Sequence, residues 1–213
     1  QEPYGDGPIQ EFLARVAKQF QVYLVAGTIP LSTDNPERVY NTTLVFNPVG
    51  KVISRYDKIH LFSFNKGNES YNESNTLEKG LIPQSFTIQE NNHNWHFGLS
   101  ICYDIRFPEL YRAIGTVDCH LVPAAFTYTT GSAHWEVLLR ARAIENQSYV
   151  LASAQGGTHD NGRKTWGHSM FINPWGEIIH QLKDGEGFIL GELNRQSIDD
   201  VRANLPALNH RTL

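Results

Sequence analysis

The stretch WHFGLSICYDIRFPELYRAI, residues 95–114, predicts a buried strand that leads directly into a helix. Residues 95–101 form a mostly apolar run of strand length, and Pro108 suits the first turn of a helix over residues 107–114. Cys102 therefore stands at a strand-to-helix junction, close to backbone N–H groups that favour negative charge. Such a place lowers the pKa of a thiol, and the N–H of Tyr103 would be an oxyanion donor. A core cysteine is the alternative that this local pattern leaves open.

The rest of the chain alternates between strand and helix patterns. Asp6 is a candidate cap for a first helix, whose apolar stripe continues as far as Phe20. Helices are also predicted over residues 133–146 and 198–205, and strands over residues 22–29, 40–46, 51–56, 85–89, 120–125, 149–154, 167–172, 177–181 and 187–193. Residues 63–83 are polar and predict a long loop. The length and this pattern together predict a single α/β domain with mixed sheets over residues 1–213.

The composition argues against several classes of partner. The formal net charge is −4 and no run of Lys and Arg exceeds two residues, so nucleic acid and anionic membranes are poor partners. No apolar stretch approaches the roughly 18 residues that a membrane span requires. Cys102 and Cys119 are the only cysteines and lack a pairing pattern, which suits a reducing compartment such as the cytoplasm. Cys119 lies within an apolar strand pattern and is expected to be a core residue.

Two further residues are candidates for chemistry. Lys58 follows a strand and has apolar neighbours, so its ammonium group would be poorly solvated; a lysine whose head reaches solvent at the strand end is the alternative. Glu73 lies in the polar loop and would, by itself, be taken for an exposed acid. The sequence has no Gly-x-Ser-x-Gly motif for a serine nucleophile and no HExxH or Cys/His framework for a metal. We therefore predict neither a metal nor a cofactor.

Together these residues lie in motifs that resemble the nitrilase superfamily of carbon–nitrogen hydrolases, and the resemblance covers essentially the whole chain. Lys58 lies in YDKIHLF (residues 56–62), Cys102 in ICYDIRFPEL (residues 101–110), and Glu73 has the Glu-Ser context of a further family acid. The resemblance implies an α-β-β-α sandwich with mixed sheets and a Glu–Lys–Cys triad. Cys102 would be the nucleophile, Lys58 and the Tyr103 N–H would hold the oxyanion, and Glu73 would orient Lys58 or share protons with the base.

The branch of the superfamily can be narrowed. The segments PAAFT (residues 123–127), AHWEVLLRARAIE (residues 133–145) and WGHSM (residues 166–170) are similar to the Nit amidases. Within that group the chain looks most like the deaminated-glutathione amidases, with the omega-amidases, which act on short keto-acid amides, as the nearest rivals. The implied reaction is hydrolysis of a small carboxylate-bearing amide to an acid and ammonia through a thioester on the nucleophilic cysteine.

The resemblance also suggests substrate contacts and an assembly. Arg106 and Thr130 are candidates for binding the carboxylate or polar tail of the substrate, although Arg106 could instead form an ion pair with Asp104 or Glu109. Relatives pair across a two-fold axis through the helices that match residues 107–114 and 133–146, so a homodimer is implied.

One catalytic residue of the family has no counterpart in this sequence. The triad glutamate follows an apolar strand in a Pro-Glu context, which neither Glu2 nor Glu11 has. Because the chain starts at Gln1 and its only methionine is Met170, we expect further residues upstream, including a first β-α-β unit that carries this glutamate. The expectation is an active amidase that this sequence represents incompletely; the alternative is a non-catalytic binding or scaffold protein that kept the fold and lost its base.

Overall fold

The computed structural model describes residues 1–67, 69–90, 92–183 and 185–212. The chain divides into two compact units, Gln1–Phe86 and Thr87–Leu213, each with its own hydrophobic core. Both combine helices with β-sheets, and their mixed sheets confirm the predicted α/β class.

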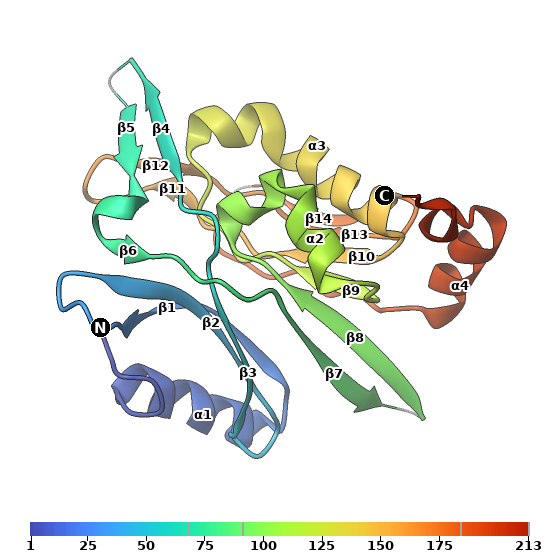
Figure 1. The fold of residues 1–213 in the computed structure, drawn as a ribbon, viewed down its shortest axis with the longest axis horizontal. Helices are drawn as coiled ribbons and strands as arrows, with labels where there is room; N and C mark the ends of the chain where they lie inside the picture. The colour runs from blue at the N-terminus through green and yellow to red at the C-terminus, as the bar shows by residue number, and fades with distance from the viewer. Residues whose placement is uncertain (68, 91, 184, 213) are drawn as a thin grey trace. The chain divides into compact units, whose positions relative to one another are not determined.

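The first unit is built on a sheet with the strand order β1-β2-β3 and a helix that packs on it (Figure 1). Its main elements are α1 (Pro8–Phe20), β1 (Leu24–Ser32), β2 (Val39–Phe46) and β3 (Val52–Asp57). β2 is antiparallel to both β1 and β3. Ala17 of α1 is fully buried against Leu31 and Leu44 of the sheet, because the apolar side chains of α1 recur on one face.

The cap of α1 differs from the prediction. Asp6 makes no side-chain cap, and the N-cap position is Gly7. The carboxylate of Glu2 instead accepts the N–H groups of Ile9 (2.5 Å) and Gln10 (3.2 Å). The spacing of the sequence does not predict this cap, because Glu2 is not next to the helix in the sequence. The backbone between them bends and brings the Glu2 carboxylate to the first N–H groups of α1.

After β3 the chain leaves the sheet and then returns to the same edge of β2. The excursion contains a hairpin of β4 (Ser63–Lys66) and β5 (Glu69–Asn72), a 3₁₀ turn η1 (Glu73–Asn75), and β6 (Leu77–Glu78). β6 pairs in parallel with β2. The predicted long loop over residues 63–83 is therefore partly structured, and β6 within it pairs with β2.

The second unit contains a six-stranded mixed sheet with the order β14-β13-β10-β9-β8-β7. The strands are β7 (Gln84–Glu90), β8 (His93–Leu99), β9 (Cys119–Leu121), β10 (Tyr149–Ala152), β13 (Ser169–Ile172) and β14 (Ile178–Leu182). β8, β9 and β10 run parallel, whereas β13 is antiparallel to both of its neighbours. A separate hairpin, β11 (Gly156–Thr158) with β12 (Lys164–Trp166), was not predicted.

Two helices lie along this sheet (Figure 1). The helical elements of the unit are η2 (Cys102–Arg106), α2 (Pro108–Ile114), α3 (Tyr128–Asn146), α4 (Arg195–Asn204) and η3 (Ala207–His210). α3 begins five residues before its predicted start, because the side chain of Thr127 accepts the N–H of Thr130 and caps it there. Trp135 and Leu139 of α3 are fully buried in the core over this sheet.

The predicted strand over residues 187–193 is absent. The described residues of this segment belong to no sheet, and Phe188 and Leu190 expose 82% and 77% of their surface. Their apolar pattern suits a strand, but a strand forms only where a neighbouring backbone supplies its hydrogen bonds.

Candidate active site

Lys58 is buried directly after β3. Its side chain is 1% exposed. Its backbone N–H donates to the Asn41 carbonyl (2.9 Å), and its backbone carbonyl accepts the Gly80 N–H (2.8 Å). A Cβ at Gly80 would lie only 2.0 Å from the Asp57 carbonyl oxygen, so the backbones approach this closely because residue 80 is glycine. A buried ammonium group is costly unless it is paired. The alternative of a lysine that reaches into solvent does not apply.

Glu73 supplies that pairing. Its Oε2 lies 2.5 Å from the Nζ of Lys58 and also accepts the Phe62 N–H at 2.7 Å. The Glu73 N–H in turn donates to the Phe62 carbonyl (2.9 Å), which ties η1 to the start of the excursion. The structure thus brings together two of the predicted site residues, and Glu73 is more than an exposed loop acid.

A second charged pair fixes the residue before Lys58. Asp57 accepts a hydrogen bond from the Nε–H of Arg55 (3.0 Å), forms an ion pair with the Nη2 of Arg55 (3.0 Å), and accepts a hydrogen bond from Thr42 at 2.5 Å. The Arg55 guanidinium also lies 4.7 Å and 5.4 Å from the ring centres of Tyr4 and Tyr40. Because its donors and its planar faces are engaged on several sides, this arginine holds the end of β3 in place.

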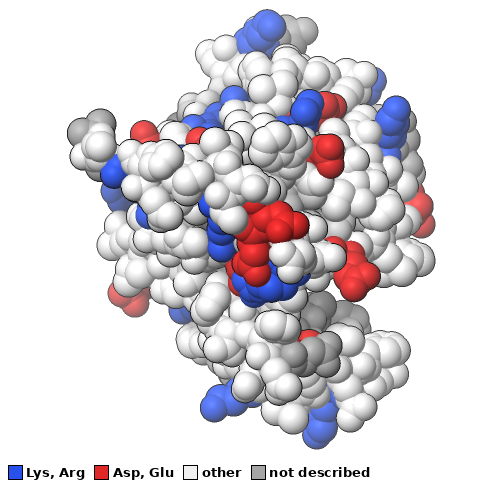
Figure 2. Space-filling model, turned by 90° about the vertical axis from the view of Figure 1, so that its right-hand side faces the viewer, with Lys and Arg blue, Asp and Glu red and all other residues white. Residues whose placement is uncertain are grey.

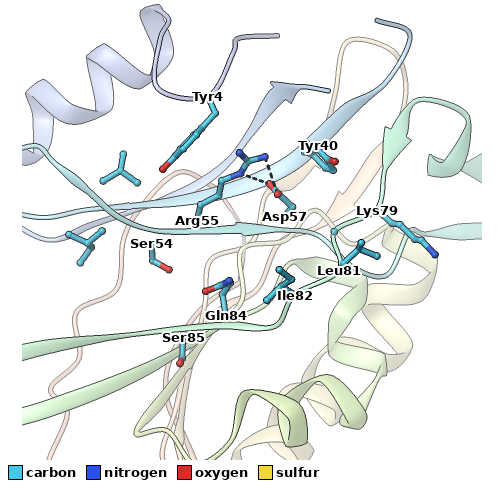
Figure 3. Close-up of a pocket in the computed structure, with 13 residues that line it drawn as sticks. Tyr4, Tyr40, Ser54, Arg55, Asp57, Lys79, Leu81, Ile82, Gln84 and Ser85 are labelled. Atoms are coloured by element: carbon cyan, nitrogen blue, oxygen red, sulfur yellow. Dashed lines mark hydrogen bonds and ion pairs between the residues drawn. The ribbon is translucent and has the colours of Figure 1, made fainter. Parts of the chain in front are cut away.

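These side chains form one wall of a pocket of about 670 Å³ (Figure 3). Lys79, Leu81, Ile82, Gln84 and Ser85 lie on the other side of it. Lys58 is not among the residues that line this pocket. The opposite charges of Arg55 and Asp57, which do line it, compensate each other. We therefore infer that the residues lining this pocket support β3, the strand before Lys58, and that the pocket itself is not where the chemistry takes place.

Cys102 occupies the predicted junction in the second unit. It follows β8 as the first residue of η2, is partly buried against the core, and donates its N–H to the Pro123 carbonyl (2.9 Å). Its φ is +51°, in the left-handed region that residues with a Cβ avoid. Backbone strain of this kind costs about 1–3 kcal/mol and is concentrated at functional sites. Tyr103, the proposed backbone donor, is the next residue of η2.

Asp104 supports this turn. Its carboxylate is fully buried and accepts the Ile101 N–H at 2.9 Å, while its own N–H donates to the Ile101 carbonyl at 3.0 Å. This carboxylate therefore bonds within its own turn. An aspartate that bonds back to a nearby N–H is a common turn device, and this signal could have been used from the sequence.

Arg106 lies among aromatic side chains at the end of η2. It donates to Nδ1 of His134 on α3 (3.2 Å), and its guanidinium lies 5.7 Å from the Tyr103 ring centre and 5.5 Å from that of Phe126. Burial lowers the pKa of Arg106 by more than the nearby Tyr103 and Cys102 raise it. His134 and Phe126 were not predicted, because only the fold brings α3 next to η2.

Thr130, the other candidate for binding substrate, has different surroundings. The hydroxyl of Thr130 is 2.8 Å from that of Thr127, and the residue is only 6% exposed, so its side chain belongs to the cap of α3. Arg106 is therefore the stronger candidate for binding a substrate carboxylate. Cys119 is 1% exposed, as predicted for a core residue, and burial raises its pKa above the usual thiol value.

Three further observations concern metal ions, membrane spans and surface charge in the part of the chain that the structure describes. Among those residues no three His, Cys, Asp or Glu side chains are grouped to hold a metal ion. None of the described helices combines the length and apolar character of a membrane span. On the face that Figure 2 presents, Lys and Arg side chains are dispersed and partly interleaved with Asp and Glu.

Comparison with known proteins identifies the class. The carbon–nitrogen hydrolase family profile matches residues 1–203. The deaminated glutathione amidase of Synechocystis sp. is 43% identical over 208 residues, which are 95% of this chain and 75% of that protein. The omega-amidase NIT2 of Homo sapiens is 35% identical over 208 residues, covering 96% of this chain and 73% of that protein.

Solved structures agree. Nit3 of Saccharomyces cerevisiae, a member of branch 10 of the nitrilase superfamily, superposes with a TM-score of 0.82 and 32% identity over 100% of this chain and 74% of its own. The NitFhit protein of C. elegans gives a TM-score of 0.83 and 36% identity over 95% of this chain, which spans half of NitFhit. The chain belongs to the carbon–nitrogen hydrolase family, in the Nit branch of the nitrilase superfamily, and is a hydrolase of carbon–nitrogen bonds.

Proposed function

We propose that this protein hydrolyses a small carboxylate-bearing amide to an acid and ammonia through a thioester on Cys102, and that deaminated glutathione is its substrate. The observation that carries the proposal is a buried lysine paired with a loop glutamate, together with a cysteine held in a left-handed turn. The substrate follows from the names of relatives, among which the deaminated glutathione amidase of Synechocystis sp. is 43% identical and the human omega-amidase 35%.

In the proposed reaction the Cys102 thiolate attacks the amide carbonyl carbon and forms the C–S bond. The carbonyl oxygen becomes an oxyanion, which Lys58 and the Tyr103 N–H stabilise by hydrogen bonds that strengthen as charge develops. The C–N bond then breaks, ammonia leaves with an added proton, and water hydrolyses the thioester to the acid. The base that transfers these protons is the triad glutamate of the family. No acidic residue of residues 1–213 lies in the Pro-Glu context, after an apolar strand, that marks this glutamate.

Each remaining residue has a proposed role. Glu73 orients Lys58, because its carboxylate accepts a hydrogen bond from the buried lysine ammonium group. Arg106 binds the carboxylate of the substrate, since a guanidinium fork matches the two carboxylate oxygens. Thr130 contributes less directly, by fixing the start of α3 that carries His134.

We also propose that the protein is a homodimer that pairs through α2 and α3. The outer face of α3 leaves Val137 and Ile144 68% and 50% exposed, beside Glu136 and Arg140. Exposed apolar side chains ringed by charges of both signs suit a self-complementary contact.

The test of the activity is an ammonia-release assay on the full-length protein. Deaminated glutathione should give a higher kcat/KM than short keto-acid amides, and Cys102→Ala should abolish release from both. Preference for the short amides would favour an omega-amidase, and no release from any amide would favour a non-catalytic protein of this fold.

A further inference from the structure

The backbone that leads to Cys102 remains bonded to β9 after β8 has ended. The Ser100 N–H donates to the Leu121 carbonyl (3.2 Å) and the Cys102 N–H to the Pro123 carbonyl (2.9 Å). The ladder therefore continues to the residue at which the chain turns into the left-handed region. Ser100 is the residue before Cys102 whose backbone N–H makes such a bond. Greater conformational freedom at Ser100 would therefore also increase the freedom of Cys102.

A tyrosine on α2 adds side-chain hydrogen bonds at Ser100. The Tyr111 hydroxyl donates to the Ser100 Oγ (2.9 Å), and the Ser100 hydroxyl donates to the Leu121 carbonyl (3.1 Å). Tyr111 and Ser100 are 0% and 1% exposed, so water does not compete for these bonds. Burial raises the pKa of Tyr111, which keeps its hydroxyl protonated as the donor.

The ring of Tyr111 is itself held on two sides. It forms a T-shaped pair with the His120 ring at a centroid distance of 4.8 Å, and the Arg142 guanidinium lies 5.3 Å from the centre of the Tyr111 ring. Arg142 also donates its Nε–H to the Ile105 carbonyl (2.8 Å), at the far end of η2. The same cluster thus touches the backbone before and after the Cys102 turn.

We infer that Tyr111 is a positioning residue for the Cys102 thiol, acting through Ser100 to hold the turn that carries it. This inference rests on the proposed role of Cys102. If the bond from Tyr111 is lost, the turn gains alternative conformations in which fewer backbone donors face the sulfur. The thiolate is then less stabilised, and the apparent pKa of Cys102 rises.

The experiment measures the rate of alkylation of Cys102 by iodoacetamide from pH 5 to 10, by peptide mass spectrometry on full-length protein. The variants are Tyr111→Phe, Ser100→Ala and the double variant, each checked for cooperative thermal unfolding. Tyr149→Phe is the matched control, because Tyr149 is also a buried tyrosine and its hydroxyl accepts the Asn194 N–H (3.2 Å), outside this chain of bonds.

We expect each single variant to be alkylated roughly threefold to tenfold more slowly at pH 7, and at the wild-type rate at pH 10. The double variant should be no slower than the slower single variant, because both changes break one chain of bonds. Tyr149→Phe should keep the wild-type profile.

An unshifted profile for both Tyr111→Phe and Ser100→Ala would overturn the inference, as would an equal shift in Tyr149→Phe or additive effects in the double variant. A wild-type profile like that of an ordinary thiol, with a pKa of about 8.5, would instead refute the proposed nucleophile. The two failures are therefore distinguishable without any measurement of turnover.

Discussion

The carboxylate of Glu73 lies 2.5 Å from the ammonium nitrogen of Lys58, and the two side chains differ sharply in exposure. Lys58 is 1% exposed, whereas the Glu73 side chain is 28% exposed. The pair exists because the excursion after β3 begins and ends on β2. An uncompensated charge is therefore much more costly on the lysine than on the glutamate, which water reaches.

This asymmetry predicts an order of stabilities. Glu73→Ala leaves a buried ammonium group without its partner and should lower the free energy of unfolding by about 3 kcal/mol. Lys58→Met removes the buried charge itself and should cost less than half as much. Glu78→Ala, which breaks an ion pair with Arg38 in which both partners are partly exposed, is the control and should cost under about 1 kcal/mol. Urea unfolding in which Lys58→Met is the least stable variant would contradict this account of the pair.

Activity should depend strongly on Lys58. In the full-length protein, Lys58→Met should lower kcat by about 10²–10³ with little change in KM, because an oxyanion donor acts mainly in the transition state. Lys79→Met changes an exposed lysine of the nearby pocket and should stay within about twofold of wild type. Steady-state ammonia release provides both constants. A Lys58→Met enzyme within tenfold of wild type would mean that Lys58 has only a structural role.

The two thiols should differ in reactivity. Brief treatment of the native protein with iodoacetamide at neutral pH should label Cys102 and leave Cys119 unmodified, because burial raises the pKa of Cys119 and shields it. In urea both should react at similar rates, which is the internal control. Peptide mapping that finds native Cys119 modified first would reverse the assignment of the nucleophile.

Much of the fold could be predicted because its signals are local. The apolar stripe of α1 and the short strand-forming runs of β2 and β3 need no distant partner to be recognised. The segment over residues 187–193 has the same local signal but remains outside the sheets, while the polar β4–β5 hairpin has no such signal and forms through main-chain bonds. Whether a strand forms depends on what lies beside it, and no periodicity contains that information.

In the candidate site, too, local sequence signals could be predicted whereas contacts between distant segments could not. Cys102 and Lys58 could be proposed because they lie within long motifs that can be read along the chain. The contact of Arg106 with His134 and the bond from Tyr111 to Ser100 join residues on different elements. They depend on how α2 and α3 lie along the sheet, which a single sequence does not specify. The structure therefore adds the supporting contacts to a site whose chemical groups were already predicted.

The proposed dimer is open to a direct test. A charge introduced at the centre of the α3 face, as in Val137→Glu, would be desolvated in the contact and should shift the protein to monomers. Val49→Glu alters an equally exposed valine of the first unit, 70% against 68% exposed, and should leave the dimer intact. Light scattering at several concentrations reports the mass. A wild-type protein that is monomeric throughout would disprove the dimer.

The last prediction concerns pH and His120. This side chain is fully buried, neither ring nitrogen has a hydrogen-bond partner among the described residues, and burial together with Arg142, Arg112 and Arg202 lowers its pKa to about 3. In the unfolded chain a histidine binds its proton near pH 6.5. Between these values the unfolded state holds more protons, so stability rises with pH and is lost as pH falls from 6.5 toward 3, by up to about 1.4 kcal/mol per pH unit. His120→Leu should remove this contribution and flatten the dependence, while His180→Leu, at an exposed position of β14, is the control. Urea unfolding at half-unit steps from pH 4 to 7.5 measures the slopes. An unchanged slope in His120→Leu would mean that the folded protein protonates this ring as readily as the unfolded chain does.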